Sequence, residues 1–379
     1  MEFPDSHRLP LSWLSEAAST PIQYRAMAEV VPAGAQDPAR LEALRAAVLE
    51  YKPALAIARK QKDTGLWGGN LLAPGSNKAY GWKETGTVYR YRHLLELGWP
   101  ADHRALRLAD RFLFQLFSRL EPHDPDPGLA ARARALLAEF ERPAKSDPGL
   151  ARWARQLGRE AAGAALARGA HAEDPRLRGV AHRIASDVSQ YLRSELAQKP
   201  FKKLHGKTVL DPTATPPTVF AIEMLAFMPA LQRERAGVIE RLRQYLSTPA
   251  AKRQYSVVAG KKLLKPLFPI LGDPLGADAR GRVTDIPFAL YWLELLARLG
   301  LLRHLPSATK VFLHFLAECD EQGIWSPKNL RALPPAKSPL TAHYFPLEGP
   351  GRSPAQRQTD VTFRLALVAR LAGIPIEVV

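Results

Sequence analysis

The same turn occurs early and late in the chain, and each copy leads into a helix. Residues 61–98 read as a helix end, a glycine-rich loop around Trp67 and a second helix that opens at Thr85–Thr87 and closes on Gly98. Residues 318–373 repeat this order, with Trp325 in the turn, a proline-rich excursion and a helix ending in Leu-Ala-Gly. A repeated unit cannot bury its own apolar face and must stack on its neighbours. The repeat therefore predicts a chain of packed helical hairpins.

Two further segments follow the same rules for starting and ending a helix. One begins at Leu210 and the other at Val283, and each has a Thr or Asp at its start, a proline near its first turn and a Gly or Pro at its end. Gly98 is expected to adopt the left-handed conformation that ends a helix. Together the four segments predict helices that begin near Thr85, Pro212, Asp285 and Thr359.

Helix pairs joined by a D-x-G-x-W turn, with a following helix that ends in Glu-Leu-Gly, resemble the α/α-toroid superfamily of squalene-hopene cyclases and protein prenyltransferase β-subunits. Asp63 begins this turn in the first copy, and Glu321 stands in its place in the second. The segment SWLSEAASTPIQYRAMAEVV, taken with the two turns, is similar to a bacterial branch of that superfamily. The resemblance covers most of the chain and is weakest over residues 128–200.

The resemblance implies an all-α fold, an α/α-toroid in which a ring of helical hairpins forms a single domain over residues 1–379. It implies that Trp67 and Trp325 are buried between successive hairpins and that the inner helices line a central cavity. A proline-rich break gives a weak internal boundary near residues 121–128. An incomplete or irregular ring stays open as a variant of this fold.

The composition limits which cellular compartment and which binding partners are expected. The single cysteine, Cys319, rules out an intramolecular disulfide framework, and no apolar run reaches the roughly 20 residues that span a bilayer. The first residues lack the basic-then-apolar order of a signal peptide, so the cytoplasm is expected, with a peripheral membrane position as a variant. A net charge of +16 favours a polyanion, either nucleic acid or an anionic membrane surface.

Basic residues are densest in two stretches, 199–207 and 252–265, where they are interleaved with Phe201 and Tyr255. Such clusters can hold phosphates or lipid head groups, although a solvated loop rim is the simpler explanation. The predicted phosphate-binding residues are Lys202, Lys203, Lys207, Lys261 and Lys262.

Three acids are candidates for catalysis: Asp211, Asp285 and Asp360. Residues 209–214 can be laid over the D-x-D-D-T-A run of class II terpene cyclases, which places Asp211 at the protonating position but replaces both flanking acids by Val209 and Pro212. The alternative is that Asp211 caps a helix that begins at Pro212. Asp285 and Asp360 are interpreted in the same two ways, as helix caps or as carboxylates facing a cavity.

Aromatic residues gather around the predicted helix starts and in the loops before them. They form either the lining of an apolar pocket or large wedges of the core. The predicted ligand-binding residues are Tyr80, Trp82, Tyr89, Tyr291, Trp292, Tyr344 and Phe345.

No metal and no cofactor are expected, because the chain has neither the Asp-x-Cys pair of a prenyltransferase zinc site nor a D-D-x-x-D-like cluster for magnesium. Two functions remain open. The first is a terpenoid-cyclase-like toroid, enzymatic or not, that binds an isoprenoid or another apolar small molecule in an aromatic-lined cavity. The second is a non-catalytic binding toroid whose basic surface engages nucleic acid or an anionic membrane.

Overall fold

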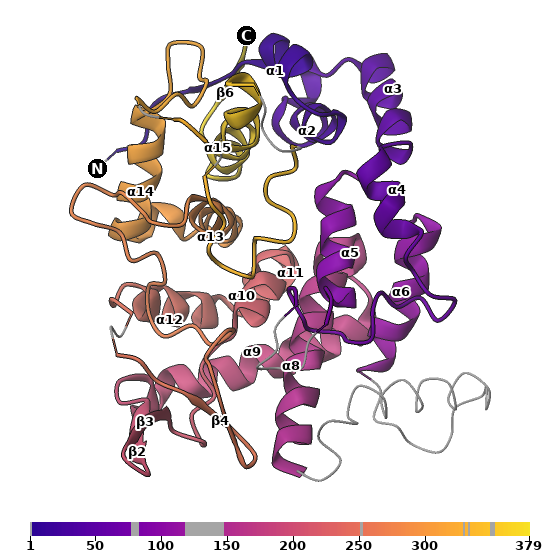
Figure 1. The fold of residues 1–379 in the computed structure, drawn as a ribbon. Coiled ribbons are helices and arrows are strands. Elements are labelled where there is room, and N and C mark those ends of the chain that lie inside the picture. Colours follow the sequence, from indigo (N-terminus) through magenta and orange to yellow (C-terminus); the bar gives the residue numbers. More distant parts are fainter. Residues whose placement is uncertain are drawn as a thin grey trace. The chain divides into compact units, whose positions relative to one another are not determined.

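The structure is a computed structural model, shown in Figure 1. It describes residues 2–76, 83–117, 148–250, 253–328, 330–332, 334–348 and 353–379.

The chain divides into two compact units. Unit 1 comprises Met1–Lys60, Arg92–Pro100 and Leu275–Val379, and unit 2 comprises Gln61–Tyr91 and Ala101–Pro274. Helix α5 (Thr87–Glu96) contributes its first half to unit 2 and its second half to unit 1. The single domain stays a prediction, and the predicted boundary at 121–128 lies outside the described residues. Most of the described chain is helical, which is compatible with the all-α class.

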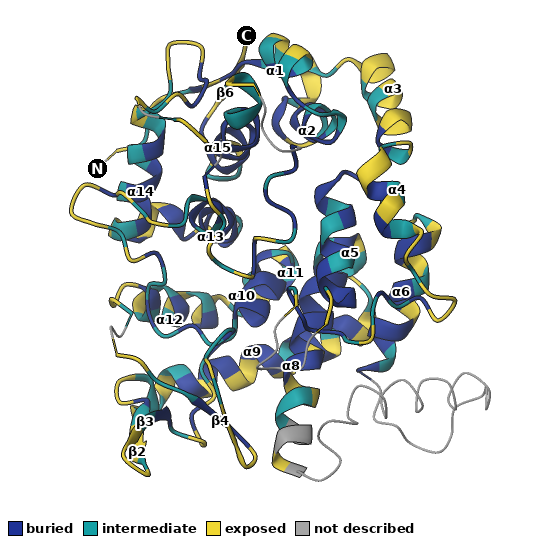
Figure 2. Ribbon diagram, in the orientation of Figure 1, coloured by how far each residue is buried: buried dark blue, intermediate teal, exposed yellow. Residues whose placement is uncertain are grey.

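Unit 1 is built around two buried helices, α13 (Ile286–Arg298) and α15 (Thr359–Leu371), which pack against each other. Figure 2 shows both as almost entirely buried, whereas α3 (Pro38–Leu49) carries a large exposed face. The strand β1 (His7–Leu9) pairs in parallel with β6 (Ile376–Val378). The other elements of this unit are α1 (Leu11–Ala17), α2 (Thr20–Arg25), the π-helix η1 (Ala26–Val30), α3 (Pro38–Leu49), α4 (Lys52–Ala58), α14 (Pro306–Ala317) and the short 3-10 turns η2 (Ala33–Ala35), η7 (Leu302–His304) and η8 (Ala355–Arg357).

Unit 2 is centred on α10 (Val219–Ala226), all of whose residues are buried and which packs on α8 (Pro148–Leu166). Two β-hairpins, described below, lie in the same unit. The remaining elements are α6 (Arg104–Gln115), the π-helix η5 (Ala167–His171), α9 (Pro175–Arg193), the 3-10 turn η6 (Glu195–Ala197), α11 (Pro229–Glu234) and α12 (Ala236–Leu246).

The repeated turn has the same backbone geometry in both copies, one in each unit. Gln61 forms an antiparallel bridge with Trp67, and Cys319 forms the same bridge with Trp325. Both tryptophans are 1% exposed, which confirms the prediction that they are buried. The sequence repeat is therefore also a structural repeat.

The glycine within this turn is required by its backbone. Gly65 has φ +85° and Gly323 has φ +88°, in the left-handed region that side chains disfavour. A Cβ at Gly65 would lie 2.3 Å from the Leu108 carbonyl oxygen, and one at Gly323 would lie 2.2 Å from that of Arg8. In each unit the turn thus lies directly against a distant backbone segment.

Three of the helices end with a left-handed glycine: Gly98 (φ 80°), Gly300 (φ 68°) and Gly373 (φ 75°). In each case the N–H of the next residue donates to the carbonyl five positions back, as at Trp99 and Leu94, where the N···O distance is 3.0 Å. This is the Schellman arrangement, and it satisfies carbonyls that the helix end leaves without partners. The predicted stop at Gly98 is confirmed.

One predicted helix start is wrong. The helix expected from Pro212 begins at Val219, where the Thr218 hydroxyl accepts a hydrogen bond from the Ala221 N–H over 3.1 Å. The Asp211 carboxylate instead closes a short turn by accepting from the Thr213 N–H. Pro216 and Pro217 delay the helix further, because a residue before proline is disfavoured in the α region.

Candidate anion-binding site

Two lysine-bearing β-hairpins lie side by side in unit 2 (Figure 1). The first pairs β2 (Phe201–Leu204) with β3 (Lys207–Leu210) through a two-residue loop. Both loop residues, His205 (φ 47°) and Gly206 (φ 77°), are left-handed, as a type I′ turn requires. This loop matches the twist of the strands and fixes their register.

The second hairpin pairs β4 (Val257–Ala259) with β5 (Lys262–Leu264). Gly260, with φ 58°, opens its two-residue loop. Trp153 and Leu264 pack on Ala259. Backbone hydrogen bonds of Ser256, the residue before β4, connect the two hairpins. The Ser256 N–H donates to the Thr208 carbonyl over 3.1 Å, and the Ser256 carbonyl accepts from the Leu210 N–H over 2.9 Å.

All five lysines predicted to bind phosphate lie on these hairpins and are exposed. Lys202 is 3.6 Å from the Asp211 carboxylate in a largely exposed ion pair, and the Lys203 ammonium donates to the Thr208 hydroxyl. Residues 199–210 and 253–272 contain no Asp or Glu. The hairpin strands therefore carry no acidic residue of their own, and Asp211, directly after β3, partly neutralises Lys202.

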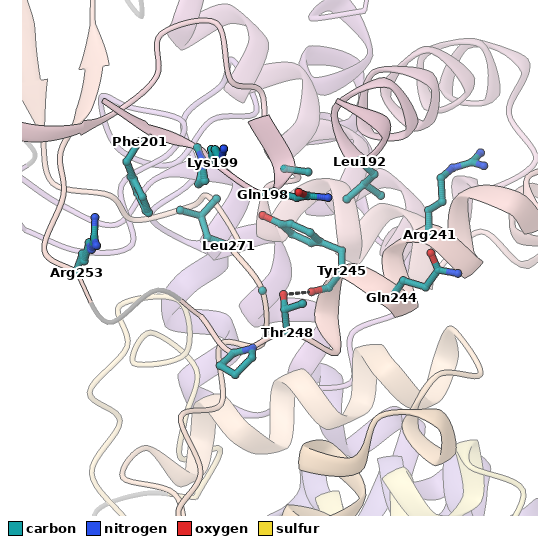
Figure 3. Close-up of a pocket in the computed structure, with 14 residues that line it drawn as sticks. Leu192, Gln198, Lys199, Phe201, Arg241, Gln244, Tyr245, Thr248, Arg253 and Leu271 are labelled. Carbon is teal, nitrogen blue, oxygen red and sulfur yellow. Dashed lines mark hydrogen bonds between the residues drawn. The ribbon is translucent and has the colours of Figure 1, made fainter. Parts of the chain in front are cut away.

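A pocket of about 810 Å³ opens in unit 2 where the chain enters the first hairpin (Figure 3). Lys199 and Phe201 reach it from the start of β2, Arg241 and Tyr245 from α12, and Arg253 from the segment before β4. Its volume lies within the range of pockets that hold small organic ligands.

The aromatic side of the pocket is held in place by hydrogen bonds and ring contacts. The Tyr245 hydroxyl lies 3.3 Å from that of Tyr191 and donates to the Ile270 carbonyl. The Phe201 and Tyr255 rings lie 5.0 Å apart. Burial raises the pKa of Tyr245, and it raises the pKa of Tyr255 to about 12. Both phenols therefore stay uncharged at neutral pH and do not offset the cations.

The pocket has three cationic side chains, Lys199, Arg241 and Arg253, and no carboxylate in its lining. Within the described part of the chain, none of the three forms an ion pair. The Arg241 guanidinium donates to the Ser189 hydroxyl from Nη2 over 3.0 Å, and its buried Nε has no hydrogen-bond partner among the described residues. The pocket is thus an electropositive hollow with an aromatic wall, and its chemistry suits an anion.

The three predicted catalytic acids do not come together in one unit. Asp211 belongs to unit 2 and lies outside the pocket lining, whereas Asp285 and Asp360 belong to unit 1. Asp211 accepts hydrogen bonds from the hydroxyl and the N–H of Thr213, and these contacts lower its pKa. A general acid needs the opposite shift, because it must hold its proton near neutral pH.

The two unit 1 carboxylates both serve as hydrogen-bond acceptors. Asp285 caps α13 by accepting from the Phe288 N–H over 3.1 Å, and it also accepts from the Ser338 N–H over 2.6 Å. Asp360 is 1% exposed and accepts from Arg364 Nε over 2.7 Å and from the Leu347 N–H over 2.8 Å. The cap interpretation accounts for Asp285, and a buried ion pair accounts for Asp360.

The predicted ligand-binding aromatics are also divided between the units. Tyr89 packs edge-on against Phe220 in unit 2, with ring centres 6.3 Å apart. In unit 1, Trp292 stacks on Phe288, and Phe345 is buried. Tyr80 and Trp82 lie outside the described residues.

Two of these aromatics, Tyr291 and Tyr344, meet around a cation of the protein itself. The Arg92 guanidinium lies 4.2 Å from the Tyr291 ring centre and 4.5 Å from that of Tyr344, and its Nη2 donates to the Tyr344 hydroxyl over 2.9 Å. Two tyrosine rings placed in this way hold a cation by cation–π contact. Here the cation is the guanidinium of Arg92.

Sequence reasoning missed a buried ion network in unit 1. Glu96 accepts from Arg25 Nη1 over 2.6 Å and from Arg364 Nη2 over 3.2 Å, and its side chain is 0% exposed. Arg25 also pairs with Glu29. The available signal was the presence of charged residues such as Glu96 and Arg364 within helical segments that also carry apolar residues, but Glu96 lies far in the sequence from both Arg25 and Arg364.

Among the described residues, no group of three or more His, Cys, Asp or Glu side chains is arranged to hold a metal ion. No helix in the described ranges has both the length and the apolar character needed to cross a membrane. Comparisons with protein-family models, with curated proteins and with solved structures found no significant match.

Proposed function

We infer that this chain is a non-catalytic binding protein that engages the phosphate backbone of nucleic acid through the two basic hairpins of unit 2. The observation that carries this inference is the absence of Asp and Glu from residues 199–210 and 253–272. These two stretches contain the adjacent hairpins with their exposed lysines, and they border the pocket with three cationic side chains. Lysines that neutralise phosphates release condensed counterions, which supplies sequence-independent affinity.

Nucleic acid fits this surface better than a membrane does. Interfacial membrane binding combines cations with a substantial exposed apolar face. Within the described residues, the exposed large hydrophobic side chains are Leu263, Val378 and Val379, and only Leu263 lies on a hairpin. A surface of lysines with one exposed leucine is suited to phosphates more than to acyl chains. A cytoplasmic location, where nucleic acid is present, is part of the proposal.

The cyclase-like hypothesis has less support. Its acids act as caps or ion-pair partners, and the contacts of Asp211 favour the ionised carboxylate. The two tyrosines that meet in unit 1 already hold Arg92. An apolar small-molecule ligand in an aromatic cavity would need a site that these residues do not supply.

The α/α-toroid is kept as a proposal for the fold. It is supported by the equal backbone geometry of the turns at Trp67 and Trp325 and by the recurring glycine stops at Gly98, Gly300 and Gly373. A solution-scattering profile that fits two separate globular bodies better than a closed ring would contradict the toroid.

The proposed function is tested by titrating the protein with a labelled DNA duplex over a series of salt concentrations. The test variant changes the five hairpin lysines to glutamine, and its control changes five exposed basic residues elsewhere: Arg59, Lys60, Lys62, Arg233 and Arg280. If all five lysines contact phosphates, the magnitude of the slope of log K against log salt falls by about 4.5 in the test variant. Equal loss in both variants, or no binding at low salt, would remove the proposal. Tighter binding to anionic vesicles than to DNA would replace nucleic acid by a membrane.

A further inference from the structure

We propose that the pocket beside the hairpins holds one nucleotide of a single nucleic-acid strand, with its base against Phe201, one flanking phosphate near Lys199 and Arg253 and the other near Arg241. This proposal rests on the proposed function, and it adds a preference for single-stranded over double-stranded nucleic acid. The hairpin lysines alone cannot distinguish a duplex from a single strand, because both carry phosphates. The pocket can distinguish them, because it offers space and an aromatic ring surface to an unpaired base.

The first argument is access. In a double helix the bases are stacked and paired inside, so a base must be unstacked before it can enter a pocket. The pocket has a volume of about 810 Å³ and is lined by side chains from α9, α12 and the segment that leads into β2. Proteins that hold single strands combine such a hollow with a positive groove along the backbone.

The second argument is the placement of the cations. In the view of Figure 3, Lys199, Phe201 and Arg253 lie on one side of Tyr245, and Arg241 lies on the other. A strand has a phosphate on both sides of each base, so it can contact cations at both edges of the pocket. A free mononucleotide has its phosphate on one side only. The spacing of charge therefore favours a strand.

The third argument is the wall between the cations. Phe201 is half-buried, with its ring tilted 55° to that of Tyr255, and it also contributes to the pocket lining. Gln198 and Gln244 are exposed, and their amides can both donate to and accept from base edges. A ring surface with adaptable amides accepts any base, which suits binding without strong sequence preference.

The test compares three probes by fluorescence anisotropy: a labelled single-stranded oligothymidylate, a duplex of equal length, and unlabelled thymidine monophosphate as competitor. We expect Phe201→Leu to weaken single-strand binding by about 5-fold or more, since it removes the ring surface and keeps the apolar volume. Duplex binding, which depends on the hairpin lysines, should stay within about twofold of wild type by the same reasoning. Thermal unfolding checks that the variant is folded.

A second variant tests the cations. Changing Lys199 and Arg253 to glutamine should lower the single-strand salt slope by about 1.4, because each phosphate contact contributes about 0.7. Its matched control changes two exposed basic residues of unit 2 outside the pocket, Lys62 and Arg233, and should leave that slope unchanged.

The outcomes separate this proposal from the proposed function. Wild-type single-strand affinity in Phe201→Leu, or equal losses for strand and duplex, would overturn the pocket proposal while salt-dependent duplex binding still stood. Thymidine monophosphate that binds as tightly as the oligonucleotide would assign the pocket to a free nucleotide instead. Absence of binding to both nucleic acids at low salt would remove both proposals.

Discussion

Thr87 and Trp67 exchange two hydrogen bonds across the repeated turn of unit 2. The Trp67 N–H donates to the Thr87 hydroxyl over 3.1 Å, and that hydroxyl donates to the Trp67 carbonyl, also over 3.1 Å. In unit 1 the Trp325 N–H donates to the Thr362 hydroxyl over 3.0 Å. A threonine in the first turn of the following helix thus fixes the turn in both copies.

Replacing Thr87 by valine should therefore destabilise the protein more than its small change in shape suggests. Thr87 is 0% exposed, so the variant leaves the N–H and the carbonyl of Trp67 buried and short of a partner. Each such group costs about 1–3 kcal/mol, and we expect a loss of about 2–6 kcal/mol in the free energy of unfolding measured by urea titration. Thr87→Ser keeps the hydroxyl and is the control. Equal stability of the two variants would contradict the role of the hydroxyl.

Gly65→Ala should also destabilise unit 2, for a steric reason. Its φ of +85° disfavours any side chain, and its Cβ would approach the Leu108 carbonyl oxygen to 2.3 Å. Backbone strain of this kind costs about 1–3 kcal/mol before the clash is added, so thermal unfolding should occur at a clearly lower temperature. Gly69, four residues later, has no atom within 4 Å of an added Cβ, and Gly69→Ala should leave the melting temperature nearly unchanged. Similar effects at the two positions would refute the close approach.

Glu96→Gln tests the buried ion network of unit 1. The change removes the negative charge between Arg25 and Arg364, each of which keeps one other carboxylate, Glu29 for Arg25 and Asp360 for Arg364. Breaking a buried pair costs about 3–5 kcal/mol when the remaining charge has no partner, and we expect a loss of about 2–3 kcal/mol here. The exposed pair of Glu42 and Arg45, 3.9 Å apart, provides the comparison, and Glu42→Gln should cost less than about 1 kcal/mol. Chemical denaturation of both variants measures the difference, and equal costs would show that the network contributes little.

The features of the fold that could be predicted from the sequence are those set by neighbouring residues. The burial of Trp67 and the helix stop at Gly98 depend on residues a few positions apart, and both predictions are confirmed. The helix start at Pro212 was wrong because a short side chain, Asp211, satisfied the backbone of a turn as readily as that of a helix. The hairpins had a usable signal in the two-residue loops His205-Gly206 and Gly260-Lys261.

The candidate site was predictable only in part. The clusters of lysines are evident in the sequence. The pocket, however, brings together Lys199, Arg241 and Arg253 from three separate segments of the chain. No periodicity indicates that such segments meet. The same limit applies to Tyr291 and Tyr344, whose aromatic character suggested a ligand, while their partner Arg92 lies about two hundred residues away.

His7 should make the stability of unit 1 sensitive to acid. It lies in β1 and is 7% exposed, and burial lowers its pKa from 6.5 to about 4. Between these two values the unfolded chain binds a proton that the folded protein does not. The contribution of His7 to stability is therefore complete above pH 6.5 and is lost as the pH falls towards 4, by about 3 kcal/mol in all.

The non-titrating variant His7→Leu should escape this loss. Its free energy of unfolding, relative to wild type, should rise by about 3 kcal/mol between pH 7 and pH 4, since every other titrating group is common to both proteins. Urea titrations at a series of pH values measure this difference directly. Parallel profiles for His7→Leu and wild type would mean that the His7 imidazole becomes protonated without opening the pairing of β1 with β6.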